Sequence, residues 1–125
     1  MATGKLVGEF SAKLNTVTFS LGPHGSSILQ ANVEGSATGL GAVWGTGSFV
    51  VGGGKSGTYS WCGIAYLDNG EQVANNGVGT YESIGKHRWR TQVPAVQLSD
   101  GRTLAFEGEL DLATRSWTGK LFERS

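Results

Sequence analysis

Residues 104–112 read Leu-Ala-Phe-Glu-Gly-Glu-Leu-Asp-Leu, and this stretch decides the fold. Every second residue is apolar or glycine, and acidic residues fill most of the positions between them. Successive side chains of a β-strand point to opposite faces, so this two-residue period predicts a strand with one buried face. The Asp100-Gly101 pair just before it is typical of a tight hairpin turn, because glycine accepts a positive φ.

The same period recurs along the whole chain, and no run of a dozen residues has helical spacing. A second strong turn is expected at Asn69-Gly70. The alternating runs predict about nine strands, and the glycines inside them predict bulges and coiling. Short links between consecutive strands favour an all-β, antiparallel up-and-down meander of about 8–9 strands closed into a small barrel. A two-sheet sandwich is the competing architecture.

The length and net charge of the chain limit the classes of function that it can have. The 125 residues fit a single domain over residues 1–125, and the one cysteine, Cys62, allows no internal disulfide. Ten basic residues balance ten acidic ones, which argues against nucleic acid and against a polybasic membrane surface. No apolar run is long enough for a membrane helix, and residues 1–10 lack a signal-peptide pattern, so we expect a cytoplasmic protein.

The chain carries no hydrolase elbow, zinc-protease or phosphate-loop motif. Its two histidines, His24 and His87, lie far apart in sequence and in different kinds of element. We therefore predict no metal site and no cofactor.

The run at residues 86–92 is the most informative polar segment. Strand alternation places His87 and Trp89 on one face and a row of cations, including Arg90, on the other. We expect the cations to face solvent, so that His87 and Trp89 face the barrel interior. Glu82 on the preceding strand then has two interpretations: a cross-strand ion pair with Arg90, or an acid–base pair with His87.

Aromatic side chains on the middle strands give a second indication. Trp44 and Trp61 are expected to meet across a hairpin, and aromatics with a few polar groups suit a pocket for a flat or apolar molecule. The alternative is that the tryptophans simply fill the barrel. The predicted ligand-binding residues are Asn32, Trp44, Trp61, Asn75, Tyr81, Trp89 and Arg90.

Residues 32–41, followed by residues 44–49, read Asn-Val-Glu-Gly-Ser-Ala-Thr-Gly-Leu-Gly and Trp-Gly-Thr-Gly-Ser-Phe. This glycine-punctuated passage resembles small bacterial barrels grouped with lipocalin-like and allene-oxide-cyclase-like folds. The resemblance implies an interior that binds an apolar small molecule, in some members a cyclase or isomerase activity, and often a homo-oligomer. Allene oxide cyclases use an interior glutamate, asparagines and an aromatic residue. The residues of these types here are Glu34, Glu82, Asn32, Asn75 and Tyr81.

Three functions follow as hypotheses. The first is a barrel that binds an apolar or aromatic small molecule. The second is a cofactor-independent isomerase or cyclase, with Glu82, paired with His87, or Glu34 as the proton acceptor. It requires a glutamate inside an apolar cavity. The third is a structural protein that assembles into a homo-oligomer through an edge strand.

Overall fold

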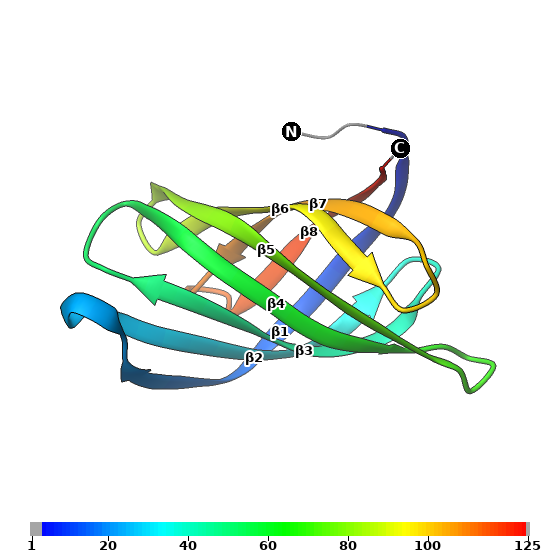
Figure 1. Cartoon of the computed structure of the whole chain (residues 1–125), viewed down its shortest axis with the longest axis horizontal. Helices are drawn as coiled ribbons and strands as arrows, with labels where there is room; N and C mark the ends of the chain where they lie inside the picture. The colour runs from blue at the N-terminus through cyan, green and yellow to red at the C-terminus, as the bar shows by residue number, and fades with distance from the viewer. Residues whose placement is uncertain (1–3, 125) are drawn as a thin grey trace.

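The computed structural model describes residues 4–124, which form a closed antiparallel β-barrel (Figure 1). Eight strands follow the chain in order around the barrel, and the last pairs back with the first, which confirms the predicted meander. The strands are β1 (Leu6–Leu21), β2 (Ser27–Ala37), β3 (Gly41–Val51), β4 (Ser56–Tyr66), β5 (Gln72–Gly85), β6 (Arg88–Leu98), β7 (Thr103–Asp111) and β8 (Ser116–Glu123). A short 3-10 turn, η1 (Pro23–Gly25), follows β1. Within the described residues, no helix has the length and apolar character needed to cross a membrane.

β1 joins two runs that the sequence pattern separates. Buried side chains of β1 fall on even positions such as Ala12. Beyond Asn15 every residue of the strand is exposed, but Val17 pairs with the buried Ala31 of β2 and therefore shares its face of the sheet. The register with β2 shifts between Leu14 and Thr16. A β-bulge of this kind inserts one extra residue, so that two neighbours face the same way. The bulge therefore changes which positions of β1 share the face of the buried β2 residues, from even positions before it to odd positions after it.

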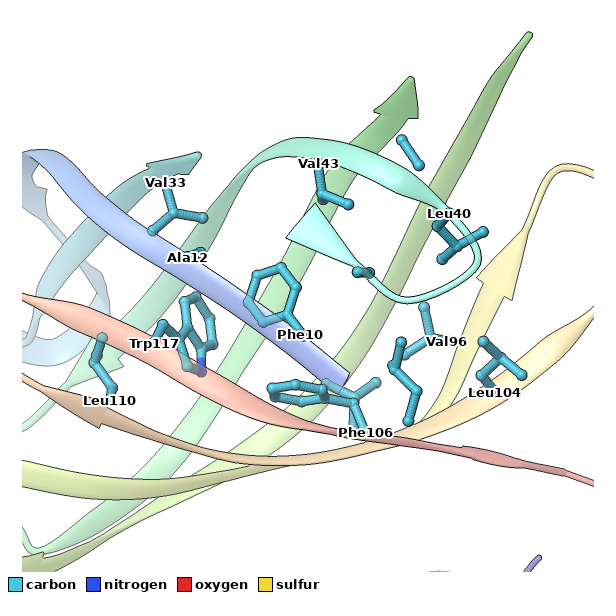
Figure 2. Close-up of a cluster of buried hydrophobic side chains, with 14 of the residues drawn as sticks. Phe10, Ala12, Val33, Leu40, Val43, Val96, Leu104, Phe106, Leu110 and Trp117 are labelled. Carbon is cyan, nitrogen blue, oxygen red and sulfur yellow. The ribbon is translucent and has the colours of Figure 1, made fainter. Parts of the chain in front are cut away.

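Aromatic rings fill the middle of the barrel (Figure 2). Trp117 is only 2% exposed, and its indole N–H donates to Thr91 Oγ1 at 3.0 Å. Its ring centroid lies between 5.6 and 6.5 Å from those of five other aromatic side chains. These neighbours, which with Trp117 are called the aromatic cluster, are Phe10, Phe49, Tyr59, Trp61 and Phe106. Because eight strands enclose little more than one layer of side chains, this cluster makes most of the interior a packed core.

Two glycines of β3 give the indoles their space. A Cβ built at Gly45 would lie 2.4 Å from a carbon of the Trp61 ring, and one at Gly47 would lie 2.8 Å from the Trp117 ring. Side-chain carbons do not approach so closely in packed interiors, so an alanine at either position would displace an indole. These glycines therefore belong to the packing of the core and not to turns.

The two ends of the barrel differ. At one end, called the terminal end, β1 begins, β8 finishes and the β2–β3, β4–β5 and β6–β7 connections lie together (Figure 1). At the other, called the far end, β1 runs on past β8, which pairs with it only over residues 6–13. The barrel is thus closed by half of β1, and the rest of that strand extends as a hairpin with β2.

Replacing Trp117 with phenylalanine is expected to destabilise the barrel by roughly 1–3 kcal/mol, because the smaller ring leaves a void and Thr91 loses its donor. Urea unfolding followed by circular dichroism measures the change. Trp44→Phe is the matched control: its indole is 51% exposed, and we expect a change within about 0.5 kcal/mol. Equal losses in the two variants would contradict a core organised around Trp117.

Candidate functional site

A cavity of about 60 Å³ lies between the aromatic cluster and the terminal end of the barrel. None of the side chains that line it is charged. Figure 2 shows several of them, with Leu40, Val96 and Leu104 on the opposite side of Phe10 from Trp117. The lining residues are Phe10, Ala37, Leu40, Val43, Tyr59, Trp61, Asn75, Val93, Val96, Leu98, Leu104, Phe106, Trp117 and Leu121.

One amide gives this apolar cavity a polar group. Asn75 is buried, its Oδ1 accepts the Trp61 indole N–H at 2.6 Å, and its Nδ2 donates to the Val73 carbonyl at 3.2 Å. A primary amide has two N–H groups and two oxygen lone pairs. Among the described residues, these two bonds leave one donor and one acceptor of Asn75 unused. The Trp61 indole thus fixes the orientation of the Asn75 amide. The amide can still donate one hydrogen bond and accept one.

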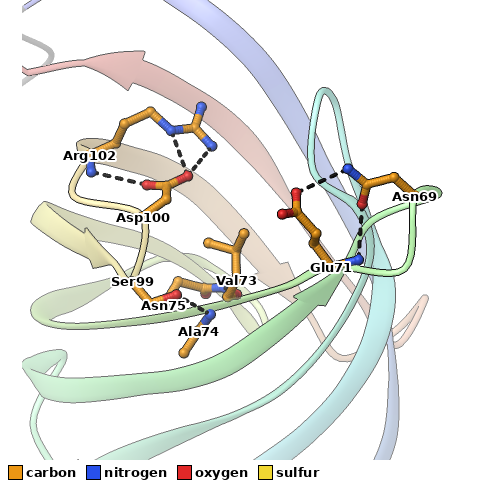
Figure 3. Close-up of polar contacts among 8 residues, drawn as sticks. All are labelled: Asn69, Glu71, Val73, Ala74, Asn75, Ser99, Asp100 and Arg102. Atoms are coloured by element: carbon orange, nitrogen blue, oxygen red, sulfur yellow. Dashed lines mark hydrogen bonds and ion pairs between the residues drawn. The ribbon is translucent and has the colours of Figure 1, made fainter.

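Two short turns lie at the terminal end of the barrel (Figure 3). Asp100 accepts the backbone N–H of Arg102 at 3.0 Å and its guanidinium at 2.8 Å, and this contact lowers the pKa of the Asp100 carboxyl. Asn69 likewise accepts the backbone N–H two residues further along the chain. Ser99 Oγ accepts the Ala74 N–H at 3.0 Å and so links the turn that contains Asp100 to β5. The predicted turns are confirmed, and each is held by hydrogen bonds within it.

Tyr59 is the one member of the aromatic cluster with an ionisable side chain, and it is deeply buried. Its ring stacks on Phe49 with centroids 4.7 Å apart, and it is 2% exposed. Its hydroxyl has no partner that meets hydrogen-bond geometry within the described residues, although the Thr91 side chain is near enough to affect its pKa. Burial raises the pKa of the Tyr59 hydroxyl far above its usual range, and Thr91 opposes this effect without cancelling it. The hydroxyl is therefore a neutral group at any physiological pH.

Four of the residues predicted for the site point inward, but they do not come together. Trp61 and Asn75 line the cavity. Tyr81 is buried nearer the far end, where its hydroxyl donates to the Val50 carbonyl at 2.7 Å. Trp89 is half-buried and packs against the core, as expected from its strand position. Only the first two therefore contribute to the candidate site.

The other predicted ligand-binding residues lie on the outer surface. Asn32 is bonded to Thr16 and Thr46 across the outer face of the sheet. Trp44 is half-exposed and pairs with Ile64, so the expected meeting of Trp44 with the inward-facing Trp61 is wrong. The physical reason is the alternation of side chains along a strand. Trp61 pairs with Gly47, which is three positions from Trp44 on β3, so Trp61 and Trp44 face opposite sides of the sheet.

The residues predicted for acid–base catalysis are also outside the barrel. Glu82 is exposed and forms a 2.8 Å ion pair with Arg90, which confirms the cross-strand interpretation. Glu34 is half-exposed on the outer face, opposite Trp44. The expectation that His87 faces the interior is wrong, since it is exposed in the β5–β6 turn with a positive φ of 57°. No aspartate or glutamate is buried in the part of the chain that the structure describes.

Sequence reasoning missed the aliphatic part of the cavity lining. Leu40 comes from the β2–β3 turn, yet it is only 6% exposed and folds over the terminal end of the barrel. A signal was present: an apolar residue between two glycines, Gly39 and Gly41, is unusual for an exposed turn. Val96 is inward because the register of β6 shifts between Val93 and Val96, a change that simple alternation does not predict.

The buried Tyr59 predicts loss of stability at alkaline pH. Its folded-state pKa exceeds that of the unfolded chain, so folding favours the protonated form and this stability declines as pH rises above about 10. We expect a loss on the order of 1 kcal/mol per pH unit from this residue. Urea unfolding across alkaline pH tests it: Tyr59→Phe should flatten the decline, whereas Tyr66→Phe, at a half-exposed position, should not. Identical slopes in the three proteins would contradict the assignment.

Comparisons of the chain with models of known protein families, with curated proteins and with solved structures find no match. The closed antiparallel barrel expected from the resemblance is present. Its finer assignment to lipocalin-like or allene-oxide-cyclase-like barrels stays a prediction.

Proposed function

We propose that this protein binds a small, neutral, mainly apolar molecule in the cavity at the terminal end of the barrel. The observation that carries the proposal is an apolar cavity in which one amide, that of Asn75, retains hydrogen-bonding capacity. Small-molecule sites have this composition: apolar walls for affinity and a few polar groups for orientation.

The size of the cavity limits the ligand. A water molecule needs roughly 10–15 Å³ of such space, and a cavity of about 150 Å³ admits benzene. At about 60 Å³ the cavity accepts a group of a few carbon atoms. The free space is about 550 Å³ when the region open to solvent is included. The ligand is therefore a narrow molecule whose apolar end enters the cavity and whose remainder extends toward solvent at the terminal end.

The chemistry of the lining limits the charge of the ligand. No lining side chain is cationic or anionic, so a carboxylate or an ammonium group would lose its hydration without gaining a counter-ion. Asn75 can donate one hydrogen bond and accept another. Alcohols, aldehydes and ketones with a short hydrocarbon chain satisfy both conditions. The isomerase alternative lacks the interior carboxylate that it requires, because Glu34 and Glu82 lie on the outer surface.

A chain-length series tests the proposal. We expect linear alcohols and ketones of about four to eight carbons to raise the melting temperature and to change the tryptophan fluorescence in a saturable way. Carboxylates of the same length should do neither. Ala37→Leu, which adds a larger side chain to the cavity lining, should abolish both effects.

Ala42→Leu is the matched control, since Ala42 is exposed on β3 and outside the cavity. It should bind the same alcohols as the unaltered chain. Circular dichroism of both variants verifies that the barrel is retained. Equal binding by Ala37→Leu and Ala42→Leu, or no saturable response to any neutral member of the series, would contradict the proposed function.

A further inference from the structure

β1 is longer than the neighbour that closes the barrel. It pairs with β8 only over residues 6–13, after which the Leu14 N–H donates to the Arg115 carbonyl. β2 covers the opposite edge of β1 as far as Leu21. Within residues 4–124, no strand pairs with the β8-side edge of residues 15–21, and this hairpin projects at the lower left of Figure 1. The free edge is roughly 23 Å long at about 3.3 Å per residue.

The composition of this free edge favours pairing with another strand. Residues 15–21 read Asn-Thr-Val-Thr-Phe-Ser-Leu and include no charge, proline or glycine. Phe19 is 68% exposed and Leu21 is 94% exposed. Natural proteins usually protect an open strand edge with charges, prolines or bulges. Here the one bulge stands at the start of the edge, at Asn15, and leaves the rest available.

The strand that fits this edge best is the same strand of a second copy. A two-fold axis through Thr18, the midpoint of the edge, makes an antiparallel pair in which Val17 of each copy lies opposite Phe19 of the other. No like charges meet, since the nearest charged residue on the strand, Lys13, would lie beyond Leu21 of the other copy. The exposed apolar side chains of both copies are covered by the same contact, whereas a polar or charged peptide would leave them in water.

We propose that two copies of this chain associate through the free edges of β1 and form a continuous sheet across two barrels. The contact is at the far end, away from the cavity, and does not depend on the proposed ligand binding. A standard interface buries about 800 Å² on each partner, and a single strand edge provides less. The dimer is therefore expected to dissociate on dilution.

Sedimentation velocity over a range of concentrations tests the proposal. The unaltered chain should shift from monomer to dimer as its concentration rises. Thr18→Lys or Thr18→Glu places like charges opposite each other at the axis and should weaken the dimer at least about tenfold. An equimolar mixture of the two variants brings opposite charges together and should restore the dimer. Thr18 is exposed, so neither change disturbs the core.

Thr118→Lys is the matched control, because Thr118 is exposed on β8 and both edges of that strand are already paired. It should dimerise like the unaltered chain, and circular dichroism verifies that each variant is folded. A chain that stays monomeric at every concentration overturns the proposal. So does a dimer that survives Thr18→Lys, which would place the contact elsewhere, or a mixture that fails to restore association, which would exclude two-fold pairing of β1.

Discussion

The contact on which the rest of the structure depends is the packing of the Trp117 indole against the inside of the sheet. Its N–H bonds to Thr91, and its ring touches five other aromatic side chains. An eight-stranded barrel has room for one such layer. Once it is filled, wall positions such as Gly47 have to lack a side chain, and the cavity lies where the layer stops. The cavity is thus a consequence of where the aromatic cluster ends.

The alternation of apolar and polar residues was sufficient to predict most of the strands. It failed where a bulge or register shift interrupts the two-residue period. The alternation of residues 104–112 and the Asn69-Gly70 and Asp100-Gly101 turns correspond directly to strands and hairpins of the barrel. The expected count of about nine strands treats the alternating runs on either side of Asn15 as separate strands. β1 instead continues through both, because a bulge there changes which positions share the inner face of β2. A bulge is fixed by the partner strand, so a single run of sequence does not distinguish it from a loop.

The candidate site was less predictable than the fold, for a reason that Trp44 and Trp61 illustrate. Both tryptophans lie on strands with alternating apolar residues, yet Trp44 is half-exposed and Trp61 lines the cavity. Alternation sorts residues into two faces but does not say which face is inside, unless the neighbours are unambiguous. On β3, Val43 and Phe49 share the inward face, so Trp44, at an odd spacing from both, has to point outward. Cavity residues such as Leu40 depend on how distant turns meet, which no local pattern contains.

The two ends of the barrel have separate physical roles. At the terminal end, three turns and a set of aliphatic side chains cover the interior, so burial there contributes to the stability of the monomer. At the far end, residues 15–21 are not needed for closure, because β8 pairs with the first half of β1. Side chains such as Phe19 then remain in water in an isolated barrel, at roughly 25 cal/mol for each Å² of apolar surface. Covering that surface would not alter the core, so the proposed association and the proposed cavity binding are physically independent of each other.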